Sequence, residues 1–211
     1  MTRAAAEDTR TLLVDTAITL WAARGMDAVS LREIGLAAGQ KNTGVINYYF
    51  GDREGLVRAV VERFAELHPD FEQMAAGFLP PRTPATARQV AGALVRPFGA
   101  LLEEAPDYVQ LIARFFADFG RSDALTQLAA ARWFAKVEDL VRVRFGLEPS
   151  SARWQFAITL TVHAIAEHAR QTQRHKSPPS PVFIEDLVDA VAGILSSKRT
   201  AHSALSSASG S

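Results

Sequence analysis

Apolar residues recur at spacings of three and four along almost the whole chain, and this pattern limits the possible fold more than any other feature. The alternation of apolar and polar residues that is typical of a half-buried strand is missing. Hydrophobic residues make up 48% of the 211 residues, which is enough to bury a core. The sequence therefore predicts an all-α protein of about nine helices.

Glycines, prolines and capping residues divide the pattern into helices. The expected helices cover approximately residues 9–24, 30–38, 42–50, 52–68, 83–104, 106–119, 122–145, 150–174 and 182–197. Ser30 and Glu33 have the spacing of a capping box at the start of the second helix. Thr83 and Pro84 look like the cap and first position of the fifth helix, and Pro97 is expected to kink or split that helix.

Residues 30–56, "SLREIGLAAGQKNTGVINYYFGDREGL", contain two short helices separated by Gly39. Two such helices packed on a longer first helix form a helix-turn-helix, whose second helix can enter the DNA major groove. Ile46 and Phe50 are four residues apart and anchor one side of that helix. Its other side carries Asn47, Tyr48 and Tyr49. Asparagine can pair with an adenine edge or phosphate, and tyrosine can bond phosphate, so the pattern predicts DNA contact.

The segment from Thr9 to Val60 resembles the N-terminal DNA-binding domain of TetR-type transcriptional regulators. The matching features are the Thr-Arg start at Thr9, Trp21 to Gly25 with an aromatic residue four before the glycine, Ser-Leu-x-x-Ile from Ser30 to Ile34, Ala38-Gly39, and "YYFGDREGL" ending at Leu56. Several matches in a fixed order are more specific than one short motif. The resemblance implies a helix-turn-helix domain over residues 1–52 and a helical ligand-sensing and dimerisation domain over residues 53–197. Residues 198–211 are small and polar, and we expect a disordered tail.

The resemblance also implies which residues touch DNA. The groove-facing set is Thr43, Gly44, Val45, Asn47, Tyr48 and Tyr49, with Lys41 and Asn42 in the preceding turn. Arg10, Ser30 and Arg53 would contact phosphate. The segment between Gly39 and Phe50 is one residue longer than the commonest family pattern, so the sequence leaves open which of residues 40–44 reach the DNA.

Charge is balanced both in the whole chain, with 23 Lys and Arg against 23 Asp and Glu, and in its N-terminal part. Residues 1–64 contain eight Lys and Arg (3, 10, 24, 32, 41, 53, 58 and 63) and eight Asp and Glu (7, 8, 15, 27, 33, 52, 54 and 62). A DNA-binding face must therefore come from the local placement of charge. We expect a modest dependence of DNA affinity on salt.

The C-terminal half is rich in aromatic residues, which indicate either an apolar ligand pocket or ordinary core. The candidate pocket residues are Phe98, Leu101, Tyr108, Ile112, Phe115, Phe116, Trp133, Trp154, Ile158, Thr161 and His163. Helix 150–174 has two apolar faces and helix 182–197 has one, which fits a four-helix seam between two subunits or packing within one. The candidate dimer residues are Ile158, Ile165, His168, Leu187, Val188, Val191, Ile194 and Leu195.

Other classes of protein find little support in the sequence. Without cysteine the chain has no disulfide or thiolate metal site, and we expect His163, Glu167 and His168 to form polar contacts, so no metal or other cofactor is predicted. Nucleophile-elbow, zinc-protease and phosphate-loop motifs are missing, so we expect no enzyme. The sequence has no apolar run of about 18 residues and no secretory signal pattern, so we expect a cytoplasmic protein.

Together these features predict a homodimeric transcriptional regulator that binds a palindromic operator in double-stranded DNA. The resemblance implies a repressor that a small apolar or amphipathic effector releases from its operator. Three alternatives remain open at this stage: a ligand-dependent activator, an all-α small-molecule-binding protein without operator control, and a scaffold that binds only protein.

Overall fold

The computed structural model describes residues 3–42, 44–82, 84–118 and 130–197. Within these ranges it contains ten helices and no strand, which confirms the all-α prediction. The helices are α1 (Arg3–Arg24), α2 (Leu31–Ala37), α3 (Val45–Phe50), α4 (Arg53–Leu67), α5 (Phe71–Gly77), α6 (Ala87–Glu104), α7 (Pro106–Asp118), α9 (Ala130–Phe145), α10 (Ala152–His175) and α11 (Pro181–Ser196). None of the described helices is long and apolar enough to span a membrane. The expected tail, 198–211, and the start of the helix expected over 122–145 lie outside the described residues.

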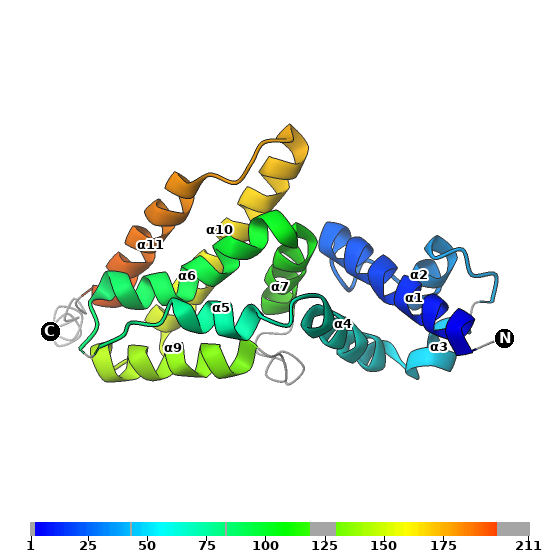
Figure 1. Cartoon of the computed structure of the whole chain (residues 1–211), viewed down its shortest axis with the longest axis horizontal. Helices are drawn as coiled ribbons and strands as arrows, with labels where there is room; N and C mark the ends of the chain where they lie inside the picture. Colours follow the sequence, from blue (N-terminus) through cyan, green and yellow to red (C-terminus); the bar gives the residue numbers. More distant parts are fainter. Residues whose placement is uncertain (1–2, 43, 83, 119–129, 198–211) are drawn as a thin grey trace, which may run out of the picture.

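The molecule is elongated, with the short helices α2 and α3 at one end and α9, α10 and α11 towards the other (Figure 1). Helix α4 leads from the helix-turn-helix to the C-terminal domain. Helix α1 packs against both α4 and α7, so these three helices form the junction between the two domains. In the C-terminal domain, α6 packs on α11, and α10 packs on both α7 and α11.

Several predicted caps are confirmed. Asp52 Oδ1 accepts a hydrogen bond from the Gly55 amide at 2.7 Å, and Ser151 Oγ accepts one from the Trp154 amide at 3.4 Å. Ser30 Oγ accepts from the Glu33 amide at 3.1 Å. The expected capping box is incomplete, however, because the Glu33 carboxylate pairs with Arg24 instead of reaching back to the Ser30 amide.

The predicted start of α6 was wrong, and α5 was not predicted from the sequence. Thr86 caps α6 and forms a full capping box with Gln89, whereas Thr83, the expected cap, lies outside the described residues. Pro97 lies inside α6 without splitting it. Helix α5 has only seven residues and buries just Phe71 and Ala75 of them, too few apolar positions to show a period.

A chain of aromatic contacts crosses the core of the C-terminal domain. Phe64 of α4 meets Phe71 of α5 at 5.4 Å between ring centroids, and Phe71 meets Trp133 of α9 at 6.2 Å. Phe134, next to Trp133, then lies 5.9 Å from Trp154 of α10. The first two pairs are edge-to-face and the third is tilted, and aromatic pairs at such distances add to the stabilisation from burial, so this line of rings joins α4, α5, α9 and α10.

Candidate nucleic-acid interface

Helix α3 buries one side and exposes the other. Val45 and Ile46 are 8% and 1% exposed and pack into the core, as was expected for Ile46. Asn47 is exposed, and Tyr48 is 81% exposed, the largest value among the exposed large apolar and aromatic residues that the structure describes. Gly44, Asn47 and Tyr48 are spaced i, i+3 and i+4, so they lie on one face of the helix. This face offers an amide, a phenol and an approachable backbone to a partner.

Two residues of the predicted groove-facing set do not lie on that face. Val45 is buried against α2. Its Cγ1 lies 3.3 Å from the position that a Cβ would occupy at Gly35 of α2. Tyr49 is partly buried, and its hydroxyl is buried without a hydrogen-bond partner among the described residues. Its ring stands edge-on to Tyr48, with centroids 5.0 Å apart. Tyr49 therefore packs against the Tyr48 ring on the buried side, and Val45 anchors α3 to the core of the domain.

The turn before α3 is exposed where it is described. Lys41, Asn42 and Gly44 are all exposed, and Asn42 Oδ1 accepts a hydrogen bond from the Gly44 amide at 2.9 Å. The Val45 amide also donates to the Asn42 carbonyl at 3.3 Å, so Asn42 closes the turn with both its side chain and its backbone. Thr43, also expected to face the groove, lies outside the described residues.

The three expected phosphate contacts have different environments. Ser30 is exposed at the start of α2. Arg10 is partly buried, pairs with Glu62 at 3.0 Å and lies over the Phe50 ring, 5.6 Å from its centroid. Arg53 donates from its two terminal nitrogens to the carbonyl oxygens of Met26 and Val29, at 2.7 and 2.9 Å. This geometry does not fit the expected phosphate contact of Arg53, because its donors fasten the α1–α2 loop to α4.

The structure adds two cations that the sequence reading overlooked. Arg32 on α2 and Arg58 on α4 are exposed, and neither forms an ion pair with any residue that the structure describes. Lys41 is exposed in the same way. Arg32 could have been found from its position two residues after the Ser30 cap, on the outer side of a helix whose inner side is marked by Ile34. These side chains supply positive charge locally in a domain whose total charge is balanced.

The predicted pocket residues mostly form packed core. Phe98, Leu101, Tyr108, Trp133, Trp154, Ile158 and Thr161 are buried, Ile112 is partly buried, and the side chains of Phe115 and Phe116 lie outside the described residues. Trp133 Nε1 donates to the Ala93 carbonyl at 3.1 Å, and Thr161 Oγ1 donates to the Ala157 carbonyl at 2.8 Å. The expectation of a pocket is wrong for His163, which is exposed on the outer side of α10. Of the set, Tyr108 lines a pocket, at the junction of α1, α4 and α7.

The expected dimer residues also need correction. Six of the expected dimer residues are at most 5% exposed within one subunit and pack in its core: Ile158, Ile165, Leu187, Val188, Val191 and Leu195. His168 and Ile194 are partly buried. Nε2 of His168 accepts a hydrogen bond from the Ser180 amide at 3.1 Å, and its ring stacks on Phe183 at 4.1 Å. The side of α10 that remains open carries Phe156, which is 64% exposed.

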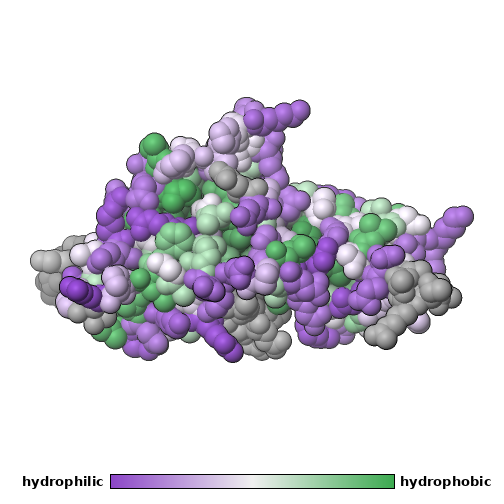
Figure 2. All heavy atoms as spheres, viewed as in Figure 1, coloured by the Kyte–Doolittle hydropathy of each residue, from purple (hydrophilic) through white to green (hydrophobic). Residues whose placement is uncertain are grey.

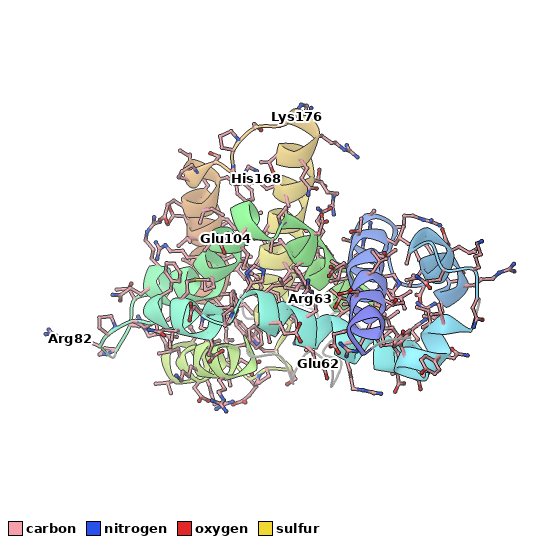
Figure 3. The ribbon with its side chains drawn as sticks, turned by 45° about the vertical axis from the view of Figure 1, so that its right-hand side comes forward. Glu62, Arg63, Arg82, Glu104, His168 and Lys176 are labelled. Carbon is pink, nitrogen blue, oxygen red and sulfur yellow. The ribbon has the colours of Figure 1, made fainter. Side chains whose placement is uncertain are left out.

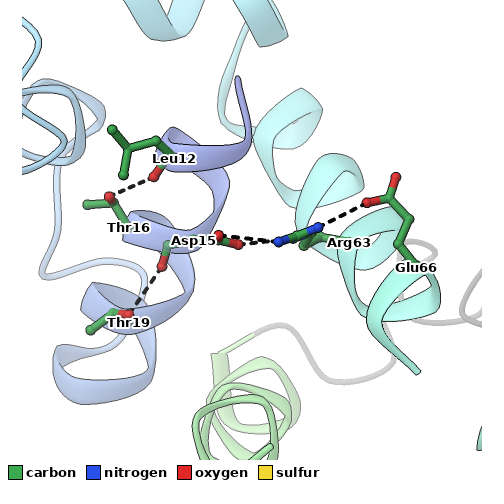
Figure 4. A network of polar contacts seen from close by, with 6 residues as sticks. All are labelled: Leu12, Asp15, Thr16, Thr19, Arg63 and Glu66. Carbon is green, nitrogen blue, oxygen red and sulfur yellow. Dashed lines mark hydrogen bonds and ion pairs between the residues drawn. The ribbon is translucent and has the colours of Figure 1, made fainter. Parts of the chain in front are cut away.

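Charged side chains form ion pairs on α10 and between α1 and α4. Glu167 accepts hydrogen bonds from Arg170, which lowers the pKa of this carboxyl group. No group of three potential ligands for a metal ion occurs within the described ranges. At the domain junction, Asp15 of α1 faces Arg63 of α4 (Figure 4), with Asp15 Oδ1 3.1 Å from Arg63 Nε. Asp15 raises the pKa of the Arg63 guanidinium.

Residues 13–60 match the model of the family described as "Bacterial regulatory proteins, tetR family". This segment contains α2, α3, the second half of α1 and the first half of α4, and the exposed face lies within it. No curated protein is significantly similar to the chain.

Solved structures extend the similarity to the full length of the fold. A TetR family regulator from Marinobacter aquaeolei VT8 is 14% identical with a TM-score of 0.57, over 92% of this chain and 98% of that one. A mutant of HlyIIR is 17% identical with a TM-score of 0.52, over 94% and 99%. A TetR family regulator from Shewanella sp. PV-4 is 14% identical with a TM-score of 0.52, over 87% and 95%. The N-terminal domain therefore belongs to the TetR family of bacterial regulatory proteins, and the chain as a whole has the fold of TetR-type regulators.

Proposed function

We propose that the chain is a dimeric, sequence-specific DNA-binding regulator of transcription, which acts as a repressor and leaves a palindromic operator when a small molecule binds. The exposed face of α3 carries this proposal. Its Tyr48 side chain projects from a six-residue helix whose other side is buried, and among the described residues its only ring contact is with Tyr49. The exposed ring lies beside the exposed Asn47, and this pair of groups on one side of a short helix supports contact with a duplex.

Each part of the α3 face has a plausible role on DNA. The carboxamide of Asn47 can pair with an adenine edge, and the Tyr48 hydroxyl can donate to a phosphate while its ring contacts a sugar or a thymine methyl. Arg32, Lys41 and Arg58 supply the positive charge that draws in phosphates. With so few cations, we expect a shallow dependence of affinity on salt.

The open sides of α10 and α11 support the proposed dimer. On α10, Phe156, Leu160, His163 and Glu167 form one stripe, and on α11 Val182 is 68% exposed. Figure 2 shows hydrophobic side chains reaching the surface of the C-terminal domain among polar ones. Two subunits joined here would place two α3 helices on one side of the duplex. A two-fold arrangement reads half-sites about 34–36 Å apart, one turn of DNA.

The central experiment is selection of bound duplexes from a random pool, followed by gel-shift assays on the selected sequence. We expect a palindrome with half-sites one turn apart. Replacing Tyr48 with Ala should abolish retention without changing the melting temperature, because the side chain is exposed. Val143→Ala is the matched control, since Val143 is 80% exposed on α9 and should leave binding unchanged. Retention by the Tyr48→Ala protein would refute the assignment of α3 as the reading helix.

The dimer has its own test. Phe156→Glu places a charge in the proposed seam, and we expect a monomer in analytical ultracentrifugation together with much weaker operator binding. A Phe156→Glu protein that stays dimeric would place the seam elsewhere.

Transcription in vitro from a promoter containing the operator decides the sign of regulation: a repressor lowers the transcript level, and an activator raises it. We also propose a cytoplasmic location and a binding function without catalysis.

A further inference from the structure

Arg10 of α1 lies beside the end of the reading helix α3. Its guanidinium carbon is 5.6 Å from the centroid of the Phe50 ring, and Phe50 is the last residue of α3. The centroid of the Phe50 ring is 6.2 Å from that of Tyr49, which is 5.0 Å from that of the exposed Tyr48. A continuous row of side chains therefore connects Arg10 to the residue that we place in the DNA groove.

Arg10 has a partner, but most of its hydrogen-bond donors are free. Its Nη2 donates to Glu62 Oε2 of α4 at 3.0 Å, the only hydrogen bond of this side chain among the residues that the structure describes. A guanidinium has five N–H donors. Arg63, the next residue on α4, differs because three of its nitrogens donate to Asp15 and Glu66. Arg63 is therefore held firmly within the subunit, whereas Arg10 can exchange its single acceptor for another.

The ion pair of Arg10 and Glu62 lies at the surface. Glu62 lies beside Arg63 on α4, which packs against α1 (Figure 3), and 62% of its side chain is exposed, against 34% for Arg10. Exposed ion pairs contribute little to stability, because water and salt screen the two charges. The fold therefore loses little when another anion replaces Glu62 at Arg10.

Glu62 is unfavourable for DNA binding at this position. Arg32, Lys41 and Arg58 are exposed without an ion pair among the described residues, whereas the charge of Arg10 is neutralised by Glu62. The phosphates of both strands flank a helix that lies in the major groove, and duplex DNA carries about one negative charge per 1.7 Å. A phosphate is an oxyanion, like a carboxylate, and it accepts charge-assisted hydrogen bonds from arginine. A duplex on α3 therefore offers Arg10 the same kind of acceptor that Glu62 provides.

We propose that Glu62 competes with the DNA backbone for Arg10. In the free protein Glu62 holds Arg10 beside Phe50, and on a bound duplex Arg10 exchanges this carboxylate for a phosphate. The inference rests on the DNA-binding function proposed above, and it names the group that opposes binding at the same site. Because phosphates carry no sequence information, Glu62 lowers the affinity for DNA without changing the sequence that α3 reads.

Gel shifts on the selected operator, at several salt concentrations, test the exchange. Glu62→Gln removes the competing charge, and we expect it to bind about two- to fivefold more tightly than the wild type, the range set by an exposed ion pair. A similar gain is expected on a random duplex.

Arg10→Gln combined with Glu62→Gln is the decisive variant, because its net charge equals that of the wild type. We expect operator binding to weaken about tenfold or more, since each subunit loses a charge-assisted contact with phosphate. The slope of log K against log salt should become shallower by about 0.9 for each subunit, the value for one phosphate contact.

A matched control removes an exposed ion pair far from α3. Arg142 and Glu148 lie 3.5 Å apart in the C-terminal domain, and Arg142→Gln combined with Glu148→Gln should bind the operator like the wild type. Thermal unfolding of every variant shows that it is folded at the temperature of the assay.

Three results overturn the exchange: Glu62→Gln binds no more tightly than the wild type, its gain is restricted to the operator, or the double variant of Arg10 and Glu62 binds like the wild type with an unchanged slope. In the last case the pair only joins α1 to α4. The wild type separates this inference from the function on which it rests. A wild-type protein that retains no duplex refutes both, whereas operator binding by the wild type with any of these three results refutes the exchange alone.

Discussion

Gly55 is the position at which one added methyl group should disturb the DNA-reading helix. Its amide donates to the Asp52 cap at the start of α4, and a Cβ built on it would overlap the carbonyl oxygen of Phe50, the last residue of α3. The same Cβ would stand only 2.9 Å from the Phe50 carbonyl carbon. Carbon atoms in good contact are about 3.5–4.0 Å apart, so α3 and α4 must separate by roughly 0.6 Å or more.

The expected cost follows from this overlap. Overpacking of this kind costs about 1–3 kcal/mol, and the overlapping atoms belong to backbone that cannot rotate away. Alanine is a better helix former than glycine by up to about 1 kcal/mol, which is too little to reverse the sign. At about 2–4 °C for each kcal/mol in a chain of this size, Gly55→Ala should lower the melting temperature by up to about 12 °C after this offset. It should also weaken operator binding, because it tilts the face that carries Tyr48.

The assay is thermal unfolding followed by circular dichroism, with gel shifts on the selected operator. Gly77→Ala is the matched control: Gly77 ends α5, and no atom of the residues that the structure describes lies within 4 Å of the Cβ it would gain. That variant should be neutral or slightly more stable and should bind DNA normally. If Gly55→Ala is as stable as Gly77→Ala and binds the operator equally well, the close approach of α3 and α4 is not a constraint on this fold.

Two further predictions concern single side chains. Arg53→Ala should lower the free energy of unfolding by about 2 kcal/mol, because the Met26 and Val29 carbonyls lose charged donors. Arg58→Ala should leave the free energy of unfolding in chemical denaturation unchanged and should weaken DNA binding. Equal stability of the two variants would contradict this difference between the two arginines. Burial lowers the pKa of His168 in the folded protein, so the unfolded chain takes up a proton at higher pH than the folded one. The free energy of unfolding should therefore fall as pH drops through about 6.5 and should level off below the folded pKa. His168→Phe keeps a ring beside Phe183 and should lack this component, so a constant stability difference between the two proteins from pH 8 to 5 would refute it.

Local sequence signals were sufficient for much of the fold. Ser30, Asp52 and Ser151 start helices because a side-chain oxygen can satisfy an amide three residues away, a relation that the sequence shows directly. Gly25, Gly39 and Gly51 have positive φ at the predicted helix ends. The start of α6 was misjudged because Thr83 and Pro84 resemble a cap and first turn, while the true box of Thr86 and Gln89 lies three residues later.

The site was harder to predict, because it depends on contacts between distant residues. The motif match gave Asn47 and Tyr48 correctly as exposed residues, but α3 has only six residues, so a small rotation decides whether Val45 faces out or in. Arg53 lies 24 and 27 residues from the carbonyls that it binds, and no local pattern indicates that contact. The burial of the α11 apolar stripe within one subunit likewise depends on how α6 and α10 pack against it.

The contacts of Arg53 and Gly55 make the helix-turn-helix and α4 a single lever. Arg53 fastens the α1–α2 loop to the first turn of α4, and Gly55 locks the end of α3 to the same turn. We therefore expect a movement of α4 to carry α2 and α3 with it, with a pivot at the far end, where α4 stops at Leu67 and Pro69 follows. Along a helix of 15 residues, about 22 Å at 1.5 Å per residue, a rotation of a few degrees at that pivot displaces the tip by more than an ångström.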